Sequence, residues 1–451
     1  MDARILRIEL RRSLALWAGL LIAAVGVFVL FASNPPYRSW LELAVFQRDT
    51  MQLTWPLALA AGAWQGIRER HSRVAELLAT TPRPRRRRVL PIAAAMAIAA
   101  VAAYLVMLAG ASGHLWNFEV YLSPGTVPII ATGALAMIAA VWLGQALGSL
   151  LPSPLTAPIL VVAGFALLAV LPPLLWDPDR RPGTVLLFPQ LQGPRGGGYL
   201  VQTFSARANL SQALWLAALA ATGLALFAAA RPATRVAAVV VPILIGAAIA
   251  VPAMPRLVDS AWVTDRRAAE VICTRDDPAI CIARSHSYAL DYLRGPAHEA
   301  LAALAAKLPS APTRVLVETG DKPYQGRPPA NTILLVAPDP TDYKREDLLW
   351  RMLDGAGVPA CPNLIGELDK PNQRYIAARS VAAAWLLDRN PPPASGRREQ
   401  SAVAMERQAL AALRALPALV QKARVTALRD AELTCARGDR LGLLTAPHTA
   451  P

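Results

Sequence analysis

Seven long apolar stretches dominate the first 253 residues of the chain. They cover residues 13–32, 52–67, 89–110, 127–150, 155–175, 210–230 and 236–253. A helix needs about 20 apolar residues to cross the hydrocarbon core of a bilayer, so the pattern predicts seven membrane spans. The second stretch is the shortest and contains Pro56 and Gln65, so the sequence does not define where this helix begins and ends.

Beyond residue 253 the apolar runs are shorter and alternate with polar residues. The runs 313–318 and 332–336 are typical of strands. Helical periods cover 286–307, 345–355, 372–389 and 398–433, and Pro417 makes the last of these either two helices or one kinked helix. We therefore expect a polytopic α-helical membrane domain of about seven spans, residues 1–253, followed by a C-terminal α+β domain, residues 254–451.

The arginines are distributed unevenly around the apolar stretches. If the N-terminus lies in the cytoplasm, the inner segments carry 14 arginines, and the three outer loops between spans carry six. Arginine is costly to move across a bilayer and accumulates on the cytoplasmic side. The distribution predicts a multi-pass protein of the cell membrane with a cytoplasmic N-terminus. Seven spans then place residues 254–451 outside the cytoplasm.

The segment 68–88 combines this charge with a helical pattern. It carries eight arginines in 21 residues. Val74, Leu77 and Leu78 fall on one helical face, and charged residues surround them. Prolines at 82 and 84 end the pattern. We expect a short amphipathic helix at the inner membrane surface, followed by a basic run into the next span.

This segment resembles the first cytoplasmic loop of ABC-2-type transporter permeases, and the likeness extends over roughly residues 1–253. The residues that match the pattern of that loop are Glu69, Arg70, Glu76, Leu77, Leu78 and Pro82, followed by the arginines up to Arg88. In that family the loop forms a helix that docks on the ATPase subunit. The family typically has six spans. A seventh span with a large exterior domain is similar to some actinobacterial permease-like membrane proteins.

The resemblance implies the membrane subunit of an exporter, paired with an identical or a second permease subunit. It also implies that a separate ABC ATPase chain docks on the helix 68–81. The sequence itself contains no G-x-x-x-x-G-K-[ST] phosphate-binding loop, so any ATPase must be another chain. A second hypothesis is a non-transporting membrane anchor whose outer domain binds a ligand or a partner protein.

Motifs of hydrolytic enzymes are missing from the outer domain. His298 and Glu299 do not complete an H-E-x-x-H motif, because Ala302 stands at the position of the second histidine. No G-x-S-x-G occurs there either. We expect no enzyme activity and no cofactor, and a hydrolase without a recognisable motif is the least favoured alternative. Most of the net charge of +15 comes from arginines that set the orientation of the spans in the membrane. No nucleic-acid recognition motif accompanies this charge, so we expect no nucleic-acid partner.

Gly144 and Gly148 form a G-x-x-x-G motif in the fourth apolar stretch. Two small residues at this spacing let helix backbones approach closely. The partner of this face is either another span of the same chain or a second subunit.

All four cysteines lie beyond residue 253. Disulfides persist in oxidising compartments, so an even number of cysteines in this part agrees with an exported domain. Cys273 and Cys281 lie near His286, but three ligands leave a tetrahedral metal site incomplete. We therefore expect no metal and, from sequence proximity, the disulfides Cys273–Cys281 and Cys361–Cys435.

Overall fold

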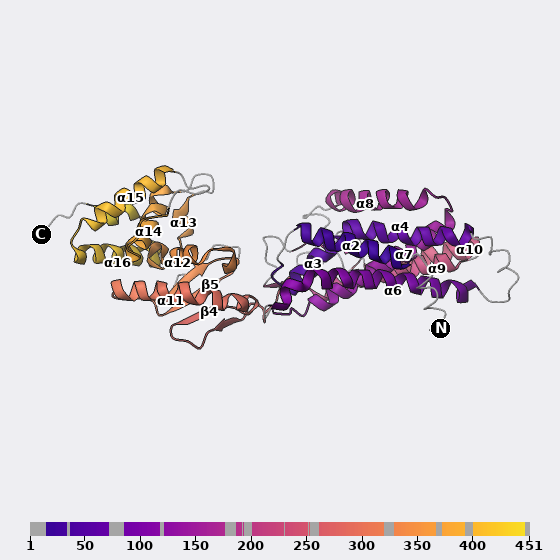
Figure 1. The fold of residues 1–451 in the computed structure, drawn as a ribbon, viewed down its shortest axis with the longest axis horizontal. Coiled ribbons are helices and arrows are strands. Elements are labelled where there is room, and N and C mark those ends of the chain that lie inside the picture. Colours follow the sequence, from indigo (N-terminus) through magenta and orange to yellow (C-terminus); the bar gives the residue numbers. More distant parts are fainter. Residues whose placement is uncertain are drawn as a thin grey trace. The chain divides into compact units, whose positions relative to one another are not determined.

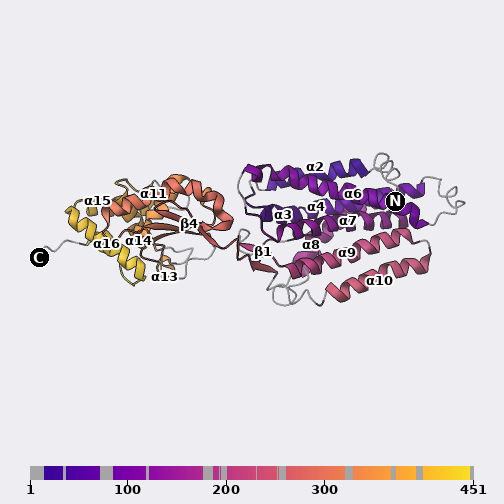
Figure 2. The same ribbon diagram turned by 90° about the horizontal axis from the view of Figure 1, so that it is seen from below.

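The computed structural model of this chain describes residues 15–33, 37–71, 85–117, 121–175, 186–191, 193, 201–229, 231–250, 252, 261–319, 329–366, 372–392 and 400–446. The chain divides into two compact units, Met1–Arg266 and Arg267–Pro451. We call them the N-terminal unit and the C-terminal unit. Figures 1 and 2 show the elements of each.

The N-terminal unit is a bundle of apolar helices (Figure 1). Its helices are α2 (Ala15–Ser33), α3 (Trp40–Asp49), α4 (Met51–His71), α6 (Arg85–Ala111), α7 (Thr126–Leu150), α8 (Thr156–Leu175), α9 (Ala206–Ala228) and α10 (Pro232–Ala250), with a 3-10 turn at Ser112–Asn117. Each of the seven predicted apolar stretches forms one of these helices. Five of them, α2, α6, α7, α9 and α10, are long and apolar enough to cross a membrane. The described residues are therefore consistent with a membrane protein.

Seven spans remain a prediction because two helices fall short of this standard. Helix α4 is 21 residues long, but its last turn, Arg68–His71, is polar. It extends beyond residue 67, where the predicted second stretch ends. Helix α8 offers only the shorter apolar stretch Thr156–Pro172.

Helices α4 and α7 are in backbone contact along two glycine pairs. Gly144 and Gly148 of α7 face α4, and α4 presents its own G-x-x-x-G motif, Gly62 and Gly66. A Cβ added to any of the four would overlap a carbonyl oxygen of the facing helix. The partner of the predicted motif is therefore another helix of the same chain, and no side chain separates the two backbones at these points.

Residues 33–51, predicted as an outer loop, contain helix α3. Ser39 caps its N-terminus by accepting a hydrogen bond from the Glu42 N–H at 3.0 Å. Near its C-terminus Arg48 is fully buried. Its Nε donates to the carbonyl oxygen of Pro189 at 2.8 Å, and its Nη2 donates to Gln212 Oε1 at 3.0 Å. The arginine joins α3, α9 and the segment 186–191, which explains why this stretch is ordered.

A two-stranded antiparallel ribbon lies beside the helices of the N-terminal unit. Strand β1 (Gln202–Phe204) pairs with β2 (Trp262–Thr264). The next residue, Asp265, accepts hydrogen bonds from Tyr121 and Ser123, both at 3.1 Å. The first compact unit therefore ends at Arg266, because β2 and Asp265 both contact elements of that unit.

The C-terminal unit is built on a four-stranded sheet in the order β3-β4-β5-β6. Its strands are β3 (Val271–Cys273), β4 (Ala279–Ala283), β5 (Arg314–Glu318) and β6 (Thr332–Val336). The β3–β4 pair is antiparallel and the other two pairs are parallel. Both predicted strands are confirmed, as β5 and β6. The sequence pattern missed β3 and β4.

Helices form the rest of this unit. They are α11 (Leu290–Lys307), α12 (Arg345–Leu353), α13 (Pro362–Ile365), α14 (Gln373–Leu386), α15 (Gln400–Arg414), α16 (Ala418–Thr434) and α17 (Arg440–Thr445), with 3-10 turns at Arg284–Ala289, Pro340–Asp342 and Asp354–Ala356. The predicted stretch 398–433 is two helices, α15 and α16, and Pro417 precedes the second. Helix α14 is central: its alanine-rich sequence is buried from Ala377 to Leu386. Apolar residues of the sheet, α11, α12 and α14 share one core.

Candidate functional site

The residues predicted to dock on an ATPase lie at the margin of the described chain. Glu69 and Arg70 belong to the last turn of α4, but their side chains lie outside the described residues. Glu76, Leu77, Leu78 and Pro82 fall in the segment 72–84, which is outside them entirely. The docking helix therefore stays a prediction. Its two ends are known: α4 ends at His71 and α6 begins at Arg85.

Both predicted disulfides are present in the C-terminal unit. Cys273 bonds to Cys281, which lies opposite it in the β3–β4 ladder. Cys361, before α13, bonds to Cys435, after α16. The metal alternative needed Cys273 and Cys281 as free thiolates, and the disulfide removes both. Among the described residues, no group of three His, Cys, Asp or Glu side chains could hold a metal ion.

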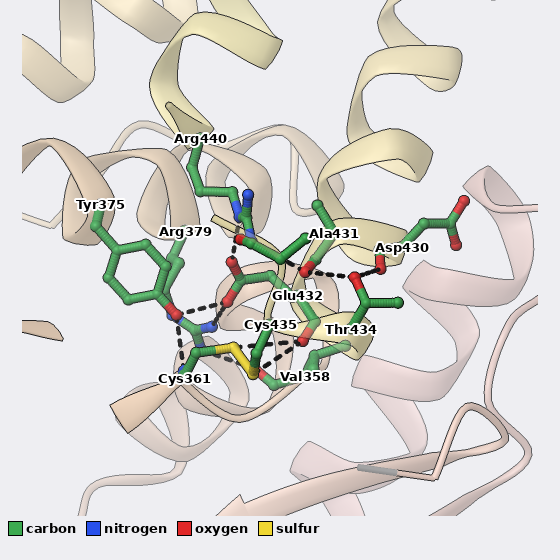
Figure 3. The surroundings of a disulfide bond; sticks show 11 residues. Val358, Cys361, Tyr375, Arg379, Asp430, Ala431, Glu432, Thr434, Cys435 and Arg440 are labelled. Atoms are coloured by element: carbon green, nitrogen blue, oxygen red, sulfur yellow. Dashed lines mark hydrogen bonds and ion pairs between the residues drawn. A yellow bond between two sulfur atoms is a disulfide. The ribbon is translucent and has the colours of Figure 1, made fainter. Parts of the chain in front are cut away.

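Beside the second disulfide lies a buried cluster of charged side chains (Figure 3). Its centre is Glu432 of α16, which is fully buried. Glu432 Oε1 accepts from Arg440 Nε at 2.9 Å, and Oε2 accepts from Arg379 Nη1. Arg379 Nε also donates to Asp354 Oδ2 at 3.0 Å. Two guanidinium groups thus meet two carboxylates, and the charge of the cluster is balanced.

Tyr375 links this cluster to the disulfide. Its hydroxyl donates to Glu432 Oε2 at 2.7 Å and accepts from the Cys361 N–H at 2.8 Å (Figure 3). Burial is the main cause that raises the pKa of Tyr375 to about 12, and the negative charge of Glu432 adds to this effect. The hydroxyl therefore stays protonated as a donor near neutral pH. Because Arg379, Glu432 and Arg440 are buried, the cluster has a structural role: it fixes α14, α16 and α17 relative to one another.

A groove of about 920 Å³ opens next to this cluster, between α12, α14 and α15. Asp354 belongs to both, because it lines the groove and accepts from Arg379. The cluster therefore holds one wall of the groove in place. The volume lies within the roughly 300–1,000 Å³ typical of ligand sites.

The walls of the groove carry both signs of charge and an aromatic ring. The residues that define its chemistry are Asp347, Glu406, Lys344, Arg351, Arg389 and Trp350. Deep in the groove Ser380 donates to Glu406 Oε2 at 3.1 Å. The described lining contains no histidine or cysteine, so the groove offers indole, guanidinium and carboxylate groups for binding and lacks the usual nucleophile–base pair.

Arg389 divides this groove from a second hollow of about 440 Å³. Its guanidinium lies 3.6 Å from Glu346 and 3.8 Å from Glu299, and all three side chains are half exposed or more. Exposed ion pairs of this length are weak, about 0–1 kcal/mol.

Sequence reasoning missed the groove because its walls come from separate parts of the chain. The one local signal was the proline-rich turn after Arg389, which forms part of the rim through Pro391 and Pro392. Arg48 was also missed. A lone arginine in a largely apolar stretch was the available signal.

Comparisons with known proteins add no identity to this geometry. No family model, no curated protein and no solved structure matches the chain.

Proposed function

We propose that the chain is the membrane subunit of an ABC-2-type exporter. A separate ATPase chain docks on the cytoplasmic segment 68–81, through Leu77 and Leu78, with charged residues at the rim of the contact. The observation that carries the proposal is the position of this cationic amphipathic segment. It connects α4 to α6, so a protein docked on it acts directly on two helices of the bundle.

The packing of α4 supports a mechanical coupling. At Gly62 and Gly66 the α4 backbone touches α7. On the other side of α7, a Cβ added to Gly223 of α9 would come within 2.6 Å of the Leu143 nitrogen. Helices α4, α7 and α9 thus form a row in which backbones meet, and a push on α4 moves the row as a body. Closure of the ATPase would tilt this row between two packings.

The C-terminal unit lies outside the cell membrane in this proposal. Its two disulfides support that placement, because disulfides persist in oxidising compartments and are rare in the cytosol. The groove between α12, α14 and α15 would then face the exterior and receive cargo or a partner. A second permease subunit would contact another surface, since Gly144 and Gly148 already contact α4.

One observation favours the second candidate, a membrane anchor that does not transport. The groove of about 920 Å³ belongs entirely to the C-terminal unit. A binding domain held at the membrane by a helical bundle needs such a groove and needs no ATPase. The two candidates therefore differ in what happens at residues 68–81.

Co-purification of the full chain with an ATPase subunit separates them. The double variant Leu77→Asp and Leu78→Asp should weaken retention by a factor of about 100 or more, because each leucine buried in a groove contributes roughly 1.5–3 kcal/mol. Leu419→Asp is the control, since Leu419 is an exposed leucine of the C-terminal unit. Retention by the wild type and by the control, with loss in the double variant, is the expected result. A wild type that retains no ATPase supports the anchor, and unchanged retention by the double variant refutes the docking helix.

A further inference from the structure

A second large hollow, of about 940 Å³, lies in the N-terminal unit between the ends of three helices. It is bordered by the start of α6, the end of α9 and the start of α10. Its apolar walls include Val89, Leu90, Leu224, Ala225, Ala237 and Val241. The polar side chains of its lining are Arg231, in the turn from α9 to α10, and Thr234, in the first turn of α10.

The hollow exists because α10 packs closely at only one of its ends. The buried residues of α10 are Gly246 and Ala250, both in its second half. There a Cβ added to Gly246 would overlap Ala218 of α9. The first half of α10 presents alanines and valines that α9 does not cover, and Figure 2 shows α10 at the edge of the bundle. Short alanine side chains on both helices leave the space open.

The charge around this hollow is positive. Arg231 is exposed at its mouth. Arg235 follows one helical turn later, and its Nε is buried with no hydrogen-bond partner in the described part of the chain. The α6 wall continues directly from four consecutive arginines, residues 85–88, which the sequence places before Val89. A hollow with an apolar body and cationic mouth fits a molecule with an apolar tail and an anionic head.

We propose that this hollow binds an anionic phospholipid from the adjoining leaflet. Its acyl chain lies along the alanine walls of α9 and α10, and its phosphate meets the guanidinium of Arg231. Basic pockets between membrane helices on the cytoplasmic side are suited to such headgroups. The proposal does not depend on transport, because it requires only that α9 and α10 lie in a membrane.

Native mass spectrometry of the purified full chain tests this site. The chain is equilibrated in detergent with equal amounts of phosphatidylglycerol and phosphatidylcholine, and the lipids retained are counted. The wild type should retain phosphatidylglycerol about fivefold more than phosphatidylcholine, the preference that one arginine near an anionic headgroup supplies. Arg231→Gln should remove this preference. Arg207→Gln, at the opposite end of α9, should keep it.

A matched pair of substitutions tests the apolar part. Ala237 and Ala248 are both exposed on α10, but only Ala237 lines the hollow. Ala237→Phe should fill the hollow and lower retention of phosphatidylglycerol at least fivefold, whereas Ala248→Phe should not. Equal retention by these two variants would overturn the proposal. A preference for phosphatidylglycerol that survives Arg231→Gln would overturn the assignment of the headgroup to Arg231. A wild type that retains both lipids equally would overturn the anionic assignment, and the hollow would then hold a neutral lipid.

Discussion

The two units of this chain reach close packing by different means. In the N-terminal unit, α4 and α7 meet through glycines at 62, 66, 144 and 148, and backbone touches backbone. In the C-terminal unit, large aliphatic side chains from a sheet and several helices fill one core. Water drives the burial of such side chains, whereas lipid gives helices no comparable reason to associate and leaves close contact as the main attraction. The contrast indicates that the two units are built for different solvents.

Buried arginines show the same contrast. Arg48 in the N-terminal unit donates to carbonyl oxygens and to the amide of Gln212. Arg379 in the C-terminal unit donates to two carboxylates. The first arrangement orders a segment of backbone over the bundle, and the second joins helices through charge. Four substitutions or changes of pH test how each unit is held together, and they are ordered from the largest expected loss of stability to the smallest.

Removal of the disulfides should destabilise the C-terminal unit unequally. The Cys361–Cys435 bond spans a sequence separation of 74 and the Cys273–Cys281 bond one of 8. Loop-closure entropy then gives a loss of about 4–5 kcal/mol for Cys361→Ala with Cys435→Ala, against about 2.5 kcal/mol for Cys273→Ala with Cys281→Ala. Pulse proteolysis of the full chain in urea measures both. Equal losses would show that the long loop is held by other contacts.

Glu432→Gln should cost the C-terminal unit about 3–5 kcal/mol. The change leaves Arg379 and Arg440 buried with one carboxylate fewer, and an uncompensated buried charge is expensive. Glu299→Gln is the control, because it removes an exposed ion pair and should cost less than about 1 kcal/mol. The same urea experiment compares them. If both variants lose the same stability, the buried cluster is not what holds the helices together.

Gly144→Ala should destabilise the N-terminal unit by about 3 kcal/mol, since the added methyl group overlaps the α4 backbone and forces the helices apart. Gly113→Ala provides the matched control, because a Cβ there meets nothing within 4 Å. Thermal unfolding of the purified chain in detergent reports the difference. An unchanged melting temperature for Gly144→Ala would mean that the α4–α7 contact is looser than described.

Alkaline pH should weaken the C-terminal unit through Tyr375. Burial raises its pKa to about 12, above the ordinary value of 10, so the folded state holds the proton more tightly than the unfolded chain. This contribution is present below about pH 10 and is lost as the pH rises toward 12, a change of about 2 kcal/mol. Tyr375→Phe should lose less stability than the wild type over this range. Parallel pH profiles of the two proteins would contradict the burial of this hydroxyl.

The apolar pattern alone predicted where the helices of the N-terminal unit lie, because runs of that length have few alternatives. It missed α3, whose order depends on Arg48 reaching Pro189, far away in the sequence. It also missed the β1–β2 ribbon, since each strand has only three residues and gains its partner from a distant segment.

The candidate site was predictable in part. Proximity in the sequence predicted both disulfides, because each joins two cysteines that are consecutive along the chain. The groove was out of reach, since α12, α14 and α15 are separate in the sequence and meet only through tertiary packing. The docking segment rests on local pattern alone and stays a prediction.

The account depends most on the C-terminal unit lying outside the cytoplasm. Acid-quenched cells lysed under denaturing conditions with a maleimide–polyethylene glycol reagent, with and without prior reduction, report whether the cysteines are kept oxidised, as they are outside the cytoplasm. Because all four cysteines are paired in two disulfides, the account predicts no mass shift before reduction and four additions after it. Four additions without any reductant would place the unit in a reducing compartment and contradict the account.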